Sequence, residues 1–276
     1  MKSILFKFTL LIFIATISFK GNAQKFQGQA FYISKSKMDL GNWGARMSEE
    51  RKKQMASRLK NRLEKKYILS FNMQESMFLE EEKIDAISGA TDSWGGYFSR
   101  GAQYKNIKEN KLVQSQEFYG KRFLVKDKLQ VVEWNLGSET KKIGNYTCYK
   151  AAALVPKAEL NWYDFSWSDL TPPANEKDAD KKKTEIKMTV IEAWYTLDIP
   201  VAQGPAEFWG LPGLILEVSA GNTTLLCSKI VLNPTEKIKI EAPSKGEDIT
   251  KSEYTSTIRK KMVEIRNNRM GRRRGR

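Results

Sequence analysis

The sequence contains no histidine and only two cysteines among its 276 residues. Without histidine, Cys–His and Ser–His–Asp catalysis and the common histidine-based zinc sites are excluded. Carboxylates are the acid–base groups that remain, and we expect no cofactor and no metal. Beyond the first 23 residues the sequence also lacks an apolar run long enough to span a bilayer.

The amino terminus has the order of features that a signal peptide needs. Two lysines precede an apolar run over residues 8–19, and Gly21 and Ala23 supply small residues at both positions that a signal peptidase reads. The run spans about twelve residues, fewer than the roughly 20 of a membrane-spanning helix. We predict cleavage after Ala23, and because Gln24 rather than cysteine follows, no lipid anchor is expected. The mature protein is expected in the periplasm or associated with the outer membrane.

The clearest helix of the sequence is expected over residues 48–67. Ser48 suits the N-cap, and Glu49 and Glu50 suit the positive first turn. The apolar residues recur at every fourth position, at Met55, Leu59, Leu63 and Tyr67. Basic residues occupy much of the remaining surface, so we expect an amphipathic helix whose apolar stripe packs on a sheet. Contact with a membrane surface or an acidic partner is the alternative.

Most of the remaining chain consists of short segments with β-strand character. Strands are predicted at residues 26–34, 67–72, 76–80, 103–108, 112–118, 122–125, 130–134, 146–154, 186–196, 214–218 and 223–232. Most connections are too short for crossover helices, which favours antiparallel pairing. A second, weaker helix is expected over residues 249–266. The predicted fold class is α+β: one curved, mainly antiparallel, half-barrel-like β-sheet with the amino-terminal amphipathic helix packed on it and the weaker helix at the carboxyl end.

One domain is expected over residues 24–265, after a signal peptide at residues 1–23. Residues 169–184 are polar and charged with almost no large apolar groups, so we interpret them as a mobile surface loop of that domain. Residues 266–276 form a basic tail that we expect to be disordered, with contact to anionic lipid as the alternative. No nucleic-acid partner is expected, because aromatic residues do not alternate with the arginines of the tail.

The most informative stretch is residues 204–218, where two prolines and three glycines within ten residues lead into an apolar strand. Such residues direct the backbone through specific turns. Together with residues 144–151 and 193–200, the stretch resembles the GLPGLI family of secreted Bacteroidetes proteins, whose name is the motif at residues 210–215. The resemblance covers about residues 140–220. It implies an exported protein of a family without an established activity. It also implies an envelope protein as partner, since genes of this family are often described beside those of outer-membrane receptors.

Large aromatic side chains gather around this stretch, eight of them between residues 162 and 209. Rings accompanied by a few polar groups are typical of a binding pocket, and the same rings also suit the core of a large sheet. The predicted ligand-binding residues are Trp194, Tyr195, Phe208, Trp209, Leu211 and Glu217. The leading hypothesis is a non-enzymatic exported envelope protein that binds an apolar or peptide-like ligand near Phe208 and Trp209, by analogy with half-barrel carriers of the periplasm.

Three alternatives stay open at this point. A carboxylate-based hydrolase would use Glu207 and Glu217, although their spacing does not place them on opposite sides of a cleft. A structural scaffold of the envelope would need no small ligand and no cavity of roughly 300 Å³ beside the motif. An oxygen-only metal site would use Asp198 with the same two glutamates. No residue is assigned a catalytic role.

Cys148 and Cys227 both lie in apolar, strand-like segments. Export to an oxidising compartment would allow a disulfide between them. The alternative is a pair of free, buried thiols that pack as small apolar groups. Strand register decides between the two, because bridging requires Cα atoms within about 7 Å of each other.

Overall fold

The computed structural model of the protein describes residues 26–37, 46–81, 98–160 and 187–274. The predicted signal peptide and the predicted polar loop at residues 169–184 lie outside these described residues. The strands of the described part are β1 (Gln27–Ser36), β2 (Glu64–Asn72), β3 (Glu75–Glu80), β4 (Phe98–Asn106), β5 (Lys111–Phe118), β6 (Lys121–Asp127), β7 (Asn135–Ile143), β8 (Tyr146–Pro156), β9 (Met188–Thr196), β10 (Leu214–Ala220), β11 (Thr223–Leu232) and β12 (Glu247–Ile249). Its helices are α3 (Glu49–Arg58), α4 (Lys60–Leu63), α5 (Lys157–Leu160) and α7 (Lys251–Arg274).

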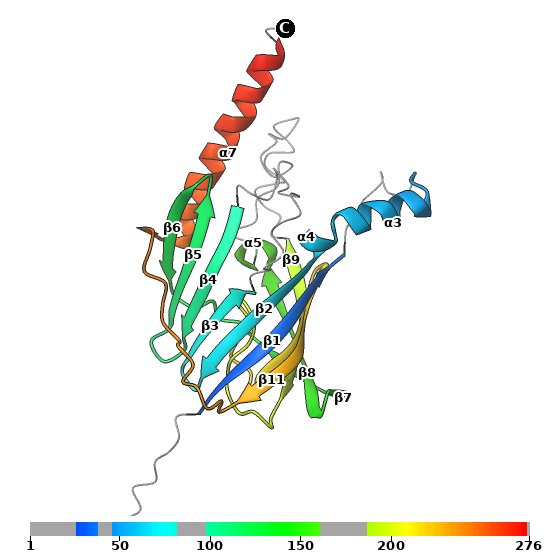
Figure 1. Ribbon diagram of the computed structural model, residues 1–276, viewed down its shortest axis with the longest axis vertical. Helices are drawn as coiled ribbons and strands as arrows, with labels where there is room; N and C mark the ends of the chain where they lie inside the picture. Colours follow the sequence, from blue (N-terminus) through cyan, green and yellow to red (C-terminus); the bar gives the residue numbers. More distant parts are fainter. Residues whose placement is uncertain (1–25, 38–45, 82–97, 161–186, 275–276) are drawn as a thin grey trace, which may run out of the picture.

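All these strands form one open sheet, in the order β12-β6-β5-β4-β3-β2-β1-β11-β10-β9-β8-β7. Within the described residues, β12 with β6 is the one parallel pair, and the other neighbours are antiparallel. The sheet is strongly curved (Figure 1). The predicted curved, mainly antiparallel sheet is therefore confirmed. β5 and β6 form a hairpin through Tyr119 and Gly120, whose φ values of 50° and 76° are those that two-residue hairpin turns require.

Successive side chains of each strand point to opposite faces of the sheet. One set points to the concave face, here named the inner face. In β1, Ala30 and Tyr32 are buried, while Gln29, Phe31 and Ile33 are only half-buried. The main apolar cluster combines such inward residues from β1, β2 and β3 with others from β8, β9, β10 and β11. The Tyr32 hydroxyl donates a 2.5 Å hydrogen bond to the carbonyl oxygen of Ile215, which joins β1 to β10. The curved sheet thus encloses a core that its distant strands share.

The turn-rich stretch folds back onto this inner face. Ile199 and Val201, which precede it, and Ala206, Phe208 and Leu211 within it are buried in the main cluster. Two glycines permit the close approach of the backbone. A Cβ on Gly213 would overlap the carbonyl oxygen of Thr196, and a Cβ on Gly204 would lie 2.8 Å from the carbonyl oxygen of Phe208. Residues 199–213 therefore form an inner layer packed against the sheet.

The amino-terminal helix begins where the sequence predicts and ends earlier. Ser48 is the N-cap and accepts a 3.4 Å hydrogen bond from the backbone N–H of Arg51. The predicted continuation to Tyr67 is wrong, because β2 begins at Glu64 and pairs with β1. The ladder to β1 satisfies the backbone groups of these residues and overrides their helical spacing. Figure 1 shows α3 projecting away from the ends of β1 and β2, and no described side chain of α3 is buried, so α3 does not cover the sheet as predicted.

The carboxyl-terminal helix is longer than predicted. Helix α7 continues to Arg274 and takes in most of the segment that was expected to be a basic tail, which contains no proline to end it. Its first half packs on the inner face of β5 and β6, where the ring of Tyr254 meets that of Phe123 edge-on at 5.4 Å. Beyond these contacts α7 extends past the sheet (Figure 1). None of the helices described combines the length and the apolar character needed to cross a membrane.

Residues 130–134 were expected to form a strand, and this prediction is wrong. They are irregular, and β7 follows them instead. Their polar groups bind the turn-rich stretch rather than a neighbouring strand. The indole of Trp209 donates a 2.7 Å hydrogen bond to the carbonyl oxygen of Gln130, and the indole of Trp134 donates a 2.8 Å bond to the carbonyl oxygen of Trp209.

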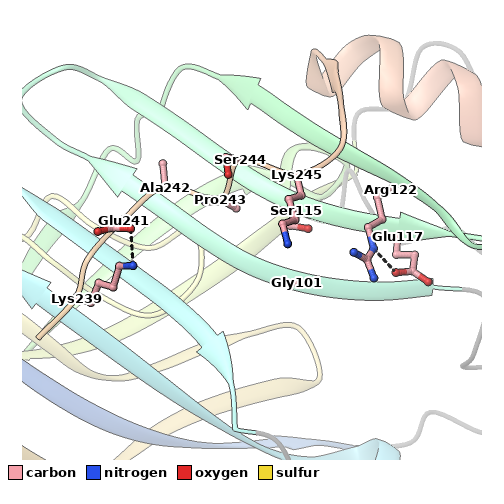
Figure 2. Close-up of a pocket in the computed structure, with 10 residues that line it drawn as sticks. All are labelled: Gly101, Ser115, Glu117, Arg122, Lys239, Glu241, Ala242, Pro243, Ser244 and Lys245. Atoms are coloured by element: carbon pink, nitrogen blue, oxygen red, sulfur yellow. Dashed lines mark hydrogen bonds and ion pairs between the residues drawn. The ribbon is translucent and has the colours of Figure 1, made fainter.

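Residues 233–246, here named the outer strap, connect β11 to β12 across the outer face of the sheet. Ile240 of the strap packs on an outer cluster made by Tyr104, Val113 and Leu124. Between the strap and the strands lies a hollow of about 530 Å³, with strap residues Lys239 to Lys245 above the strands (Figure 2). The strap therefore covers part of the face opposite to the main core.

Candidate functional site

A cavity of about 530 Å³ opens on the inner face, beside the turn-rich stretch. Its apolar wall is formed by Tyr67, Phe78, Leu160, Phe208, Val218 and Leu225. Polar groups also line it, among them Ser34, Lys65, Lys157, Thr189, Glu207 and Asn222. A cavity of this size lies within the range of roughly 300–1,000 Å³ that small-molecule sites occupy.

The aromatic part of this wall is held by ring packing. Tyr67 and Phe78 stack with their ring centroids 4.7 Å apart and 15° between the planes. Phe78 also meets the ring of Tyr32 edge-on at 6.3 Å. Because Tyr32 is fully buried and bound to Ile215, the stack rests on a rigid base. The wall is therefore formed without a ligand.

The opposite wall depends on a buried lysine. Lys105 has no exposed surface, and its ammonium group donates hydrogen bonds of 2.7 Å to the carbonyl oxygen of Gly204 and 3.1 Å to that of Phe208. Burial lowers the pKa of Lys105 to about 7, while the nearby carboxylate of Glu207 acts in the other direction. Lys105 thereby holds the turn that presents Ala206, Glu207 and Phe208 to the cavity.

The six predicted ligand-binding residues occupy three different environments. Phe208 lines the cavity. Tyr195 and Leu211 are buried in the main core, 5% and 1% exposed. Trp209 is half-buried and points away from the cavity toward Gln130. The structure thus brings one of the six residues to the cavity wall.

Trp194 and Glu217 come together on the outer face instead. The carboxylate of Glu217 forms a 2.7 Å ion pair with Lys141, whose Nζ lies 4.3 Å from the centroid of the Trp194 ring. Glu207 faces the inner cavity, so the sheet separates it from Glu217 and the two carboxylates share no cleft. Among the described residues, no group of three or more Cys, Asp or Glu side chains is placed to hold a metal ion.

The two cysteines are buried and not joined in the structure. The thiol of Cys148 donates to the carbonyl oxygen of Tyr146 at 3.8 Å, and that of Cys227 to the carbonyl oxygen of Lys229 at 3.5 Å. Burial raises the pKa of each thiol to about 11. A thiol that stays protonated near neutral pH is a poor nucleophile.

Sequence reasoning did not identify Tyr67, Phe78, Lys105, Val218 or Leu225 as site residues. The strands that carry them were predicted, but their neighbours in the sheet were not. A lysine within a strand gives no local sign of burial, since its partners Gly204 and Phe208 lie about a hundred residues away. The alternation of β10 and β11 did contain a usable signal, because Val218 and Leu225 face inward as cross-strand partners.

Part of the chain matches a known family model. Residues 134–217 match the family described as "Protein of unknown function (Porph_ging)". This segment contains β7, β8, β9 and the turn-rich stretch, and the match agrees with the predicted resemblance to an uncharacterised Bacteroidetes family. The comparison with curated proteins finds no match.

Solved structures that match this chain include two of PNGF-II, in the C2 and P21 space groups. The TM-scores are 0.48 and 0.45, each at 15% sequence identity and over 86% of this chain. The chain spans 32% and 33% of the length of those proteins.

Proposed function

We propose that this protein is a non-enzymatic binding protein of the bacterial envelope, which holds a ligand with a substantial apolar part in the inner cavity. The observation that carries the proposal is the cavity of about 530 Å³ walled by Tyr67, Phe78 and Phe208. We further propose that the chain is a member of the GLPGLI family. The turn just before its motif, at Ala206 to Phe208, forms part of the wall of that cavity.

The character of the wall supports an amphiphilic ligand. Aromatic and aliphatic side chains supply apolar contact area, and Lys65, Lys157 and Glu207 supply charges of both signs at separate points. Lys65 is already paired with Glu80 at 2.8 Å. Small-molecule sites combine mostly apolar lining with a few polar groups that orient the ligand.

Export supports the same role. A cleavable signal peptide at residues 1–23 would deliver the protein to the periplasm or the outer membrane, where an accessory protein of an outer-membrane receptor would meet apolar or peptide-like ligands. Amino-terminal sequencing of the protein recovered from the cell envelope checks this, with Gln24 expected as the first residue. Recovery from the cytoplasm with Met1 intact would contradict export.

The proposal is tested with N-phenyl-1-naphthylamine, an uncharged probe that fluoresces in apolar surroundings. The matched variants are Thr189→Trp and Val190→Trp, since these neighbours in β9 lie on opposite faces of the sheet. Thr189 lines the cavity, whereas Val190 is 59% exposed on the outer face. We expect the wild type and Val190→Trp to bind one probe per chain and Thr189→Trp to bind at least about tenfold more weakly.

Two outcomes would refute the proposal. One is probe binding that both tryptophan variants reduce equally, because the site would then lie elsewhere. The other is no saturable binding to the wild type at all, which would favour a scaffold role. Native mass spectrometry of protein purified from its own envelope gives an independent readout, because a retained small molecule would add a defined mass.

A further inference from the structure

Three glutamines form a row on the inner face beside the cavity, and we name Gln103, Gln114 and Gln116 the amide row. Gln103 of β4 is the cross-strand partner of Gln114 in β5, and Gln116 is the next inward residue of β5. Their exposed fractions are 3%, 2% and 1%. The row is therefore polar and enclosed, in a place where sheet proteins normally place apolar side chains.

Four of the six side-chain polar atoms of these amides are buried without a hydrogen-bond partner within the described part of the chain. The unpartnered atoms are Nε2 of Gln103, Oε1 of Gln114 and both amide atoms of Gln116. Two neighbours share this state, because Ser76 Oγ and both amide atoms of Gln203 are also buried without a partner there. A buried amide without a partner destabilises a fold, and most native buried polar groups are satisfied.

Stability does not account for the row. On β6, the cross-strand partners of Gln114 and Gln116 are Val125 and Phe123, which pack with α7 in an apolar cluster. Leucine side chains in the row would extend this cluster toward the main core. Glutamine at these positions is therefore best explained by a ligand that supplies the missing hydrogen bonds.

The row lies next to a residue of the cavity wall. Phe78, which lines the cavity, is the cross-strand partner of Gln103. Ser76 is the partner of Lys105, which binds the turn next to Gln203 through the Gly204 carbonyl. The unpartnered groups thus lie directly beside the aromatic wall and the turn that forms the opposite wall.

The chemistry of the row selects the ligand class. Each amide offers a donor and an acceptor without charge, which matches the N–H and C=O groups of a peptide main chain. An acyl chain would leave every amide unsatisfied. We propose that the amide row binds the main-chain groups of a short peptide segment whose apolar side chains occupy the cavity, an inference that rests on the proposed function.

The test uses acetyl-trileucine amide and the same compound with its backbone nitrogens methylated. Methylation removes the N–H donors and keeps the leucine side chains. We expect the unmethylated peptide to bind the wild type about 25-fold more tightly, at about fivefold for each of two hydrogen bonds lost. The double variant that carries both Gln114→Leu and Gln116→Leu should bind the two compounds with equal affinity. Its affinity for N-phenyl-1-naphthylamine should stay as in the wild type.

The control variant is Gln29→Leu. The side chain of Gln29 donates a hydrogen bond to Ser70 on the opposite face of the sheet, so this variant should keep the wild-type preference for the unmethylated peptide. Equal affinity of the wild type for both compounds would overturn the peptide assignment even if the double variant failed to fold. An unchanged preference in a folded double variant would also overturn it, since the row would then hold water alone. If the naphthylamine probe still binds in these cases, only this inference fails, whereas loss of all probe binding would also remove the proposed function.

Discussion

The side-chain nitrogen of Lys105 lies 2.7 Å from the carbonyl oxygen of Gly204, a residue 99 positions later in the chain. A second bond to the carbonyl oxygen of Phe208 makes this one amine the link between β4 and the turn that walls the cavity. The bond is made by a side chain with no exposed surface. The protonation of Lys105 is therefore linked to the stability of that wall.

We expect the free energy of unfolding to rise with pH between pH 7 and 8.5. Burial lowers the pKa of Lys105 to about 7 in the folded protein, whereas in the unfolded chain a lysine keeps its proton to about pH 10.4. Between these values the unfolded state holds the extra proton, so Lys105 contributes at most about 1.4 kcal/mol of added stability per pH unit. Urea unfolding at a series of pH values measures this slope.

The variant Lys105→Met should abolish most of that slope. Lys126→Met, which removes a half-exposed lysine paired with Asp248 at the surface, is the control and should retain it. Above about pH 9 the trend should reverse, because burial raises the pKa of Cys148 and Cys227 and the stability that they contribute is lost as the unfolded thiols ionise. An unchanged slope in Lys105→Met would contradict the assignment.

Gly213→Ala is expected to prevent folding. Its Cβ would overlap the carbonyl oxygen of Thr196, which is backbone within the sheet and cannot move aside. Gly221→Ala is the matched control: Gly221 has φ of 56° but open space around it, so the cost should be only about 1–2 kcal/mol. Circular dichroism and yield of soluble protein distinguish these results. A folded Gly213→Ala protein would show that the backbone of the motif can shift.

Tyr32→Phe should lower the free energy of unfolding by about 1–2 kcal/mol. The substitution removes the 2.5 Å hydrogen bond to Ile215 and leaves that carbonyl oxygen buried without this donor. Tyr149→Phe serves as the control, since the hydroxyl of Tyr149 makes no hydrogen bond within the described residues, and its effect should stay within about 0.5 kcal/mol. Equal losses in the two variants would show that the bond contributes nothing specific.

The thiols of the reduced, folded protein should resist iodoacetamide at pH 8. Burial and a pKa of about 11 keep Cys148 and Cys227 protonated and covered, and both should react once guanidinium unfolds the chain. Mass spectrometry counts the added groups. Protein isolated from the envelope gives the complementary result: if a disulfide joins Cys148 and Cys227 there, unfolding without a reductant will yield no alkylation.

Local patterns in the sequence predicted much of the sheet. Strand-like segments at residues 67–72 and 223–232 predicted β2 and β11, and the structure contains both strands. Ser48 was correctly identified as a helix start because its role depends only on the next three residues. Features that depend on near neighbours in the chain were therefore predictable.

The candidate site was less predictable because pairing across the sheet assembles it. Nothing near Tyr67 in the sequence indicates that it stacks on Phe78 against a cavity, nor does the sequence near Trp194 place that ring on the opposite face. The end of the first helix was misplaced for the same reason, since Glu64 pairs with Lys35 of a strand outside the local window. Of the six predicted ligand-binding residues, Phe208 is the one that lies in the cavity wall.

The central place of β1 affects how the chain can fold during synthesis. Its residue Gly28 pairs with Phe71 on one side and with Leu232 on the other. The middle of the sheet therefore cannot form until β11, which lies far later in the chain than β1 and β2, is available to pair. Contacts so distant in sequence slow folding, because a long loop must close before they form. A nascent chain of this kind cannot complete the middle of its sheet until β11 has been synthesised.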